Sequence, residues 1–260
     1  MTVAATIVID GVELEYVRVR QERTAPVLVF LHEGLGSVAM WRDFPQRLAA
    51  SCGCPALIYS REGYGRSAPL AAPRRTDYMH EEALVRLPAL LDRLGIAAPI
   101  LIGHSDGASI ALIHAGAHLR PVRACVALAP HVFVEDVSIA GIAAARDAYA
   151  NGTLRERLAR YHRDVDSAFR GWNEVWLSPD FRDWNIESYI AAIDCPLLLI
   201  QGRDDEYGTL AQLDVIERVT VADVSRRVLD DCGRSPQRDQ PEATLNAMAG
   251  FISQQLRSRP

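Results

Sequence analysis

The chain has 260 residues, 49% of them hydrophobic, which fits one large α/β domain or two small ones. Its formal net charge of −5, with no basic run and no apolar stretch long enough to span a bilayer, argues against nucleic acid or a membrane as a partner. The five cysteines are scattered and the first residues lack the pattern of a signal peptide, so we expect free thiols and a cytoplasmic protein. Cys52-x-Cys54 has no histidine cluster nearby, and we expect neither a metal nor a cofactor.

The chain begins with a β-hairpin signal. Residues 6–10 and 12–20 alternate apolar and polar side chains around Asp10-Gly11, a dipeptide typical of tight hairpin turns. Further strands are expected at residues 26–31, 55–59, 123–129, 195–201 and 226–229. Helices are expected at about residues 40–51, 77–94, 210–218 and 241–256. Strands that alternate with helices predict a mostly parallel central sheet covered by helices on both faces.

Residues 99–116 read as strand, sharp turn and helix around Gly103-His104-Ser105-Asp106-Gly107. This is the context of a nucleophile elbow, in which a serine occupies a strained turn between a strand and a helix. The glycines are needed because a Cβ at either position would clash with the neighbouring strand or helix. The turn would expose the Ser105 hydroxyl above the sheet, with the backbone N–H of Asp106 on the same side. The alternative is a chance match within a glycine-rich loop.

From about residue 133 to 189 the chain reads as helical and carries three of its four tryptophans, Trp172 among them. We interpret this segment as a helical lid inserted over the C-terminal edge of the sheet, where open α/β sheets bind ligands. Residues 1–132 and 190–260 then form the α/β core. An aromatic lid favours an apolar or aromatic small-molecule ligand, with Trp172 as a candidate to contact it, although lid aromatics are at least as often packing residues.

Several short motifs together resemble one family. They are the turn His32-Glu33-Gly34, the turn Gly63-x-Gly65-x-Ser67, the elbow at Ser105, the acidic loop at Asp205 and the last loop, residues 232–242. In this order they resemble the α/β-hydrolases, specifically the lid-bearing serine hydrolases related to enol-lactonases, carbon–carbon bond hydrolases and small-ester esterases. The resemblance covers nearly the whole length. It implies the α/β-hydrolase fold and hydrolysis of a small ester, thioester or lactone.

The resemblance also implies a role for each motif. Ser105 would attack a carbonyl carbon, and the N–H groups of Asp106 and of Gly34 or Leu35 would stabilise the oxyanion. The acid that orients the base falls three residues after the strand-end glycine in this family, which selects Asp205. Asp204 is the reserve candidate.

Two residues depart from the family's pattern. Glu33 stands where the oxyanion turn usually has glycine, and we expect its carboxylate to point away or to be held by a neighbour. Arg234 stands where the family has its catalytic histidine. Arginine cannot accept the proton of Ser105, because its pKa stays above about 12, so we expect a degenerate triad with impaired catalysis. We expect the Arg234 guanidinium to pair with Asp205, and the alternative is that it clamps a carboxylate or phosphate of the ligand.

Two histidines are candidates for a substitute base. His131 follows a predicted strand at the rim where ligands bind, and His162 lies in the predicted lid. The remaining histidines are expected to be structural, packing or surface residues: His32, His80, His104, His114 and His118.

Three functions stay open at this point. The first is a hydrolase with impaired or altered chemistry through Ser105. The second is a non-catalytic ligand-binding protein, for which the gibberellin receptors are an α/β-hydrolase precedent with a replaced histidine. The third is a cofactor-free lyase or oxygenase that uses the same pocket. The hydrolase is favoured, because every other motif of the family is retained.

Overall fold

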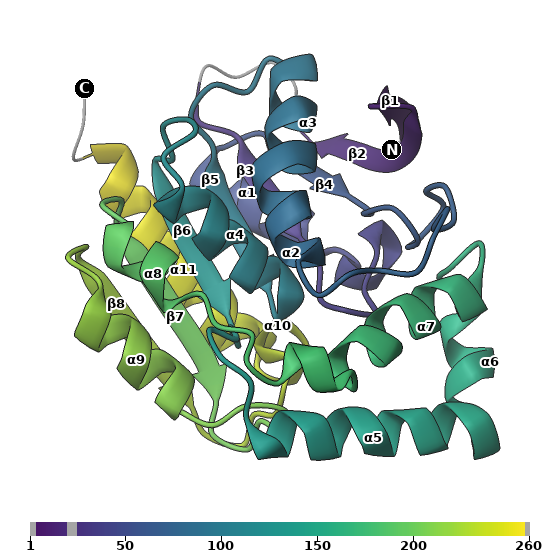
Figure 1. Cartoon of the computed structure of the whole chain (residues 1–260). Coiled ribbons are helices and arrows are strands. Elements are labelled where there is room, and N and C mark those ends of the chain that lie inside the picture. Colours follow the sequence, from purple (N-terminus) through teal and green to yellow (C-terminus); the bar gives the residue numbers. More distant parts are fainter. Residues whose placement is uncertain (1–3, 20–24, 258–260) are drawn as a thin grey trace.

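The computed structural model describes residues 4–19 and 25–257. Arg20, at the end of the predicted hairpin, lies outside the described residues. So do residues 1–3, where we expect no signal peptide pattern. Within the described residues, eight strands form one sheet in the order β1-β2-β4-β3-β5-β6-β7-β8 (Figure 1). The strands are β1 (Ala5–Ile9), β2 (Val12–Val19), β3 (Leu28–Leu31), β4 (Ala56–Tyr59), β5 (Ile100–His104), β6 (Ala124–Leu128), β7 (Leu197–Gly202) and β8 (Val224–Leu229).

The sheet is mostly parallel, as the sequence predicts. β2 runs antiparallel to β1 and to β4, and the other neighbouring pairs are parallel. Asp10 and Gly11 both have positive φ angles, 48° and 80°, as a tight hairpin turn requires, and the predicted hairpin is confirmed.

Alternate residues of the central strands bury two separate cores. In β5, Leu101 faces one core, while Ile100 and Ile102 face the other. One face of the sheet is covered by α2 (Tyr78–Glu81), α3 (Leu87–Arg93), α4 (Asp106–Gly116), α8 (Glu187–Ala192) and α9 (Ala211–Val219). The other face is covered by α1 (Phe44–Cys52) and α11 (Pro241–Arg257), which follows the short helix α10 (Pro236–Asp239). The predicted layering is therefore confirmed.

The helix predicted over residues 77–94 is not continuous. Between α2 and α3 lies a π-helical turn, η2 (Glu82–Arg86). Pro88 follows in the first turn of α3, and its missing N–H prevents a regular α-helical hydrogen bond back to Leu84. The periodicity of apolar residues survives this irregularity, which explains why the sequence pattern reads as one helix.

The chain between β6 and β7 is helical, as expected, and we call residues 133–189 the helical insertion. It contains α5 (Asp136–Asn151), α6 (Leu154–Leu158), α7 (Val165–Trp176), η3 (Pro179–Phe181) and the start of α8. Figure 1 shows α5, α6 and α7 lying beyond the carboxyl ends of the parallel strands. α8 instead returns to the sheet and packs on α4.

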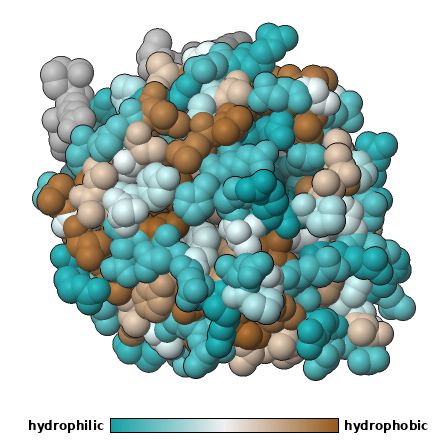
Figure 2. Space-filling model, in the orientation of Figure 1, coloured by the Kyte–Doolittle hydropathy of each residue, from teal (hydrophilic) through white to brown (hydrophobic). Residues whose placement is uncertain are grey.

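The face shown in Figure 2 is a mosaic of hydrophilic and hydrophobic side chains. Large exposed apolar side chains lie on separate elements: Val8, Val85, Leu119 and Val221. No helix in the described part of the chain combines the length and the apolar character needed to cross a membrane.

At Gly107 the backbone of α4 lies very close to the end of β3. A Cβ at Gly107 would overlap the backbone carbonyl groups of Leu31 and His32, whereas one at Gly250, in α11, meets no atom within 4 Å. We expect Gly107→Ala to lower the free energy of unfolding by about 2–3 kcal/mol, because backbone atoms must move. Gly250→Ala should raise it by about 0.5–1 kcal/mol, because alanine is the better helix former. Urea unfolding of both variants is the measurement, and equal effects would contradict the close approach.

Candidate active site

Ser105 occupies the turn between β5 and α4, at the carboxyl end of a central strand. Its φ of 55° and ψ of −120° lie in a region that costs a non-glycine residue about 1–3 kcal/mol. A Cβ at Gly103 would overlap the backbone of Gly107 and Ala108, so only glycine permits this turn. The N–H of Asp106 lies in the first turn of α4, where backbone donors have no intrahelical partner. The local geometry is that of a nucleophile elbow.

Arg234 meets Ser105 from the loop after β8. Its Nη2 atom lies 2.5 Å from Ser105 Oγ, and its Nη1 atom lies 2.8 Å from Asp205 Oδ2. The expected ion pair between Arg234 and Asp205 is confirmed, and both side chains are largely buried, 11% and 1% exposed. The guanidinium therefore bridges the serine and the carboxylate, where a triad histidine would stand.

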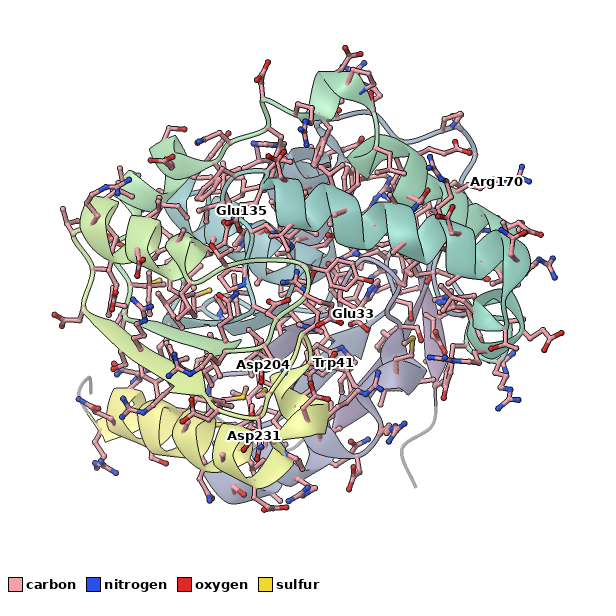
Figure 3. All side chains as sticks on the ribbon, turned by 90° about the horizontal axis from the view of Figure 1, so that it is seen from below. Glu33, Trp41, Glu135, Arg170, Asp204 and Asp231 are labelled. Carbon is pink, nitrogen blue, oxygen red and sulfur yellow. The ribbon has the colours of Figure 1, made fainter. Side chains whose placement is uncertain are left out.

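Asp205, rather than Asp204, supplies the carboxylate of this ion pair. Its Oδ1 atom accepts the N–H of Tyr207 at 2.9 Å, and its Oδ2 atom accepts a hydrogen bond from Gln201 Nε2 at 3.1 Å. The side chain of Asp204 is exposed on the surface (Figure 3).

His131 contacts the same guanidinium nitrogen, Arg234 Nη2, that contacts Ser105. Its Nε2 atom lies 2.5 Å from Arg234 Nη2, and because arginine only donates, the imidazole accepts this hydrogen bond. Burial and then the positive charge of Arg234 hold the pKa of His131 well below its ordinary value. The ring is therefore neutral, with its proton on Nδ1, an atom that has no hydrogen-bond partner among the described residues. Trp176 packs edge-on against it at 4.9 Å.

Arg61 shapes the turn that carries the candidate oxyanion donors. Its buried guanidinium donates from Nη1 to the carbonyl of His32 at 2.7 Å and from Nη2 to the carbonyl of Glu33 at 3.2 Å. His32 is structural, as expected: its Nε2 accepts the N–H of Arg61 and its Nδ1 bonds the carbonyl of Glu33. In a trans peptide the N–H points opposite to the carbonyl, so the Gly34 N–H points away from the Glu33 carbonyl that Arg61 holds.

Glu33, His104 and His162 form hydrogen bonds and an ion pair around the turn that begins at His32. The Glu33 carboxylate lies 3.3 Å from His104 Nδ1, so it is held by a neighbour, as predicted. His104 Nε2 bonds the carbonyl of Arg234 at 2.8 Å and links the last loop to the elbow. His162 uses both ring nitrogens, on Gly65 N at 3.0 Å and on the Leu35 carbonyl at 2.9 Å, and so has no lone pair for Ser105.

A pocket of about 420 Å³ opens over these groups, between the core and the helical insertion. Figure 3 views the molecule from this side, with Glu33 near the centre and α5 in front. The predicted residues that line the pocket are Gly34, Leu35, Ser105, Asp106, His131, Trp172 and Arg234. Trp172 packs directly over Gly34, whose Cβ position its indole ring occupies. The structure thus brings together the predicted site residues, with Asp205 directly behind Arg234.

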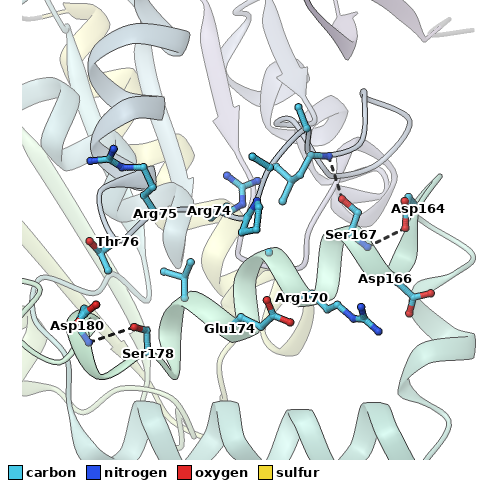
Figure 4. A pocket seen from close by; sticks show the side chains of 16 residues that line it. Arg74, Arg75, Thr76, Asp164, Asp166, Ser167, Arg170, Glu174, Ser178 and Asp180 are labelled. Atoms are coloured by element: carbon cyan, nitrogen blue, oxygen red, sulfur yellow. Dashed lines mark hydrogen bonds between the residues drawn. The ribbon is translucent and has the colours of Figure 1, made fainter.

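A larger hollow, about 850 Å³, lies elsewhere (Figure 4). It separates the loop of residues 70–76 from α7 and is lined by both arginines and carboxylates, among them Arg74, Arg170 and Glu174. None of the predicted site residues lines it. No group of three or more histidine, cysteine or carboxylate side chains in residues 4–19 and 25–257 is arranged to hold a metal ion.

A model of the alpha/beta hydrolase family matches residues 28–247, most of the chain. The chain belongs to the α/β hydrolase family. The predicted family and fold class are thereby confirmed. No curated protein sequence matches the chain significantly.

Solved structures of other α/β hydrolases share the fold at low sequence identity. The enol-lactonase from Burkholderia xenovorans LB400 is 18% identical, with a TM-score of 0.74 over 96% of this chain and 100% of that one. The proline iminopeptidase of Mycobacterium smegmatis is 18% identical, with a TM-score of 0.73 over 98% of this chain and 99% of that one. A hydrolase from Pseudomonas aeruginosa PA01 is 18% identical, with a TM-score of 0.72 over 96% and 98%.

Sequence reasoning missed two residues of this α/β hydrolase's pocket region. One is Arg61, whose signal is its position two residues after the end of a predicted buried strand, at the edge of the sheet where the site lies. Tyr207, whose ring lies 5.7 Å from the Arg234 guanidinium carbon, was also missed. Its position two residues after Asp205 was the available signal.

The buried, neutral state of His131 generates a pH dependence of stability. Its folded pKa lies below the unfolded value of about 6.5, so below that pH the unfolded chain binds a proton that the folded chain does not. We expect the free energy of unfolding to fall as the pH drops from 7 to 5. His131→Gln should reduce that slope by up to about 1.4 kcal/mol per pH unit. Urea unfolding across this range is the measurement, and an unchanged slope would contradict the neutral assignment.

Proposed function

We propose that this α/β hydrolase acts on a small carboxylic ester, thioester or lactone through Ser105, and that its turnover is slow because Arg234 replaces the general base. The observation that carries the proposal is the 2.5 Å contact between Arg234 Nη2 and Ser105 Oγ. In this contact the hydroxyl accepts a hydrogen bond. A serine nucleophile needs the opposite arrangement, in which the hydroxyl donates its proton to a base.

The other parts of the mechanism are retained in this proposal. Ser105 Oγ attacks the carbonyl carbon and its proton passes to solvent water, while the oxyanion is stabilised by the N–H of Asp106 and by that of Gly34 or Leu35. The Arg234 charge favours a serine alkoxide but offers no acceptor for its proton. Loss of one triad member typically lowers turnover by about 10⁴–10⁶, with residual catalysis from the oxyanion donors and binding.

Arg234 also contacts His131, the second potential base. Both hydrogens of Nη2 are directed to acceptors, one to Ser105 Oγ and one to His131 Nε2. The lone pair of His131 is therefore occupied by the same cation that contacts the nucleophile. His131 is the substitute base that the geometry supports, and it can act only when the guanidinium withdraws.

The helical insertion acts in this proposal as a lid over an apolar or aromatic ligand. Trp172 and Trp176 line the pocket beside Ser105, which supports such a ligand. A second candidate function, ligand binding without turnover, is favoured by the same buried ion pair, since it preserves the pocket without a base. Labelling with a fluorophosphonate probe separates the two, because covalent labelling of Ser105 requires a reactive hydroxyl.

Restoring the base is the direct test. Arg234→His should increase the rate of p-nitrophenyl acetate hydrolysis by about 10²–10⁴, because the serine, the carboxylate and the oxyanion donors are in place. The gain is smaller than the full triad effect, since the loop is adapted to arginine.

Matched variants identify the path of the proton. Ser105→Ala in the Arg234→His background should abolish the gain, while His131→Gln in that background should leave most of it. Ser105→Ala alone should remove the slow basal reaction that passes through the serine, a small change in absolute rate. Brisk hydrolysis by the unmodified protein that is lost on Ser105→Ala would show that another base is at work and would overturn the degenerate-triad interpretation.

A further inference from the structure

A second cavity, of about 320 Å³, adjoins the active-site pocket. It is bounded by three segments that are distant in the sequence: the end of η1 (Val38–Trp41), the region of α6, and α10. Five residues line both cavities: Met40, Leu154, Arg157, Leu158 and Arg238. The two cavities therefore adjoin along these residues, and Ser105 lines the inner one. We call the outer part the arginine mouth, after its charged residues Arg42, Arg157, Arg160 and Arg238.

The arginine mouth carries four positive charges and no carboxylate in its lining. None of the four guanidiniums forms an ion pair with any of the described residues, in a chain whose net charge is −5. Elsewhere on the surface, Arg47, Arg155 and Arg226 each pair with a carboxylate. A concave surface with charge of one sign concentrates the field and attracts the opposite charge.

Two carboxylates of the inner pocket accept hydrogen bonds from the backbone of the last loop and form no ion pair with the four arginines. Asp239 accepts the N–H groups of Gly233 and Ser235, and Glu206 accepts the N–H of Arg234. These hydrogen bonds stabilise the last loop, and the four guanidiniums stay available to a ligand.

Arg42 provides an independent observation. Its backbone has φ 53° and ψ −129°, close to the strained conformation of Ser105. Glycine would adopt this conformation without strain, whereas arginine destabilises the fold here. The presence of arginine therefore indicates a role for its side chain. Strain of this kind is found at functional sites.

We propose that the arginine mouth binds the anionic end, a carboxylate or a phosphate, of a substrate whose carbonyl group lies at Ser105. The apolar side chains of Met40, Leu154 and Leu158 line the path between the two ends and accommodate a short aliphatic chain. Guanidinium groups are the preferred partners of both anions, through charge-assisted hydrogen bonds. This inference deepens the proposed function and rests on it for the position of the carbonyl group.

The test measures binding, not turnover, so that its failure is distinct from the failure of the proposed function. In the full-length Ser105→Ala protein, calorimetry compares octyl phosphate, octanoate and octanol. The two anions should bind about tenfold more tightly than the alcohol, and the advantage should shrink in 0.5 M NaCl. Tighter binding of octyl phosphate supports a phosphate as the anionic end, and tighter binding of octanoate, despite its smaller charge, supports a carboxylate.

Charge reversal locates the site. Arg42→Glu combined with Arg160→Glu should weaken anion binding about tenfold and leave octanol unaffected. The matched control, Arg93→Glu with Arg227→Glu, makes the same change of charge at exposed residues outside both cavities and should preserve the anion advantage. Equal binding of anions and alcohol, or equal weakening by both double variants, would overturn the proposal.

A third variant separates binding from folding. Arg42→Gly should raise the urea midpoint of unfolding, because glycine relieves the backbone strain, and yet weaken anion binding. A protein that is stabilised and retains full anion affinity would show that Arg42 has no part in the site.

Discussion

The guanidinium of Arg234 is the group on which the arrangement of the pocket depends. It neutralises a carboxylate that is almost completely buried, and a charge of that kind without a partner would destabilise the fold by several kcal/mol. The same group occupies the hydroxyl of Ser105 and the lone pair of His131. One side chain thus contacts three polar groups of the pocket and holds them together by hydrogen bonds.

The surrounding residues support this substitution. The carbonyl of Arg234 is held by His104, which places the loop after β8 directly beneath the elbow. The oxyanion turn is fixed separately by Arg61, through the carbonyls of His32 and Glu33. Neither support involves the Arg234 side chain, so the turn that contains His32 and Glu33 is held independently of that side chain.

Much of the fold and the centre of the site followed from local sequence patterns. The elbow at Ser105 is a short motif flanked by its own strand and helix, and Asp205 lies at a fixed distance from a strand-end glycine. The contact between Arg234 and Asp205 was predictable, because a buried carboxylate needs a cation. The contacts of Arg61, the engagement of His131 and the arginine mouth were not predictable, since each joins segments that only the folded sheet brings together. Roles in catalysis stay predictions until the variants are measured.

His162 gives the helical insertion a particular mechanical property. Its ring joins the segment between α6 and α7 to the N–H of Gly65 and to the carbonyl of Leu35, a residue of the oxyanion turn. Displacing this segment would break both hydrogen bonds and leave the Gly65 N–H and the Leu35 carbonyl without this partner. Movement of the helical insertion and the position of the turn that carries Leu35 are therefore coupled through one imidazole.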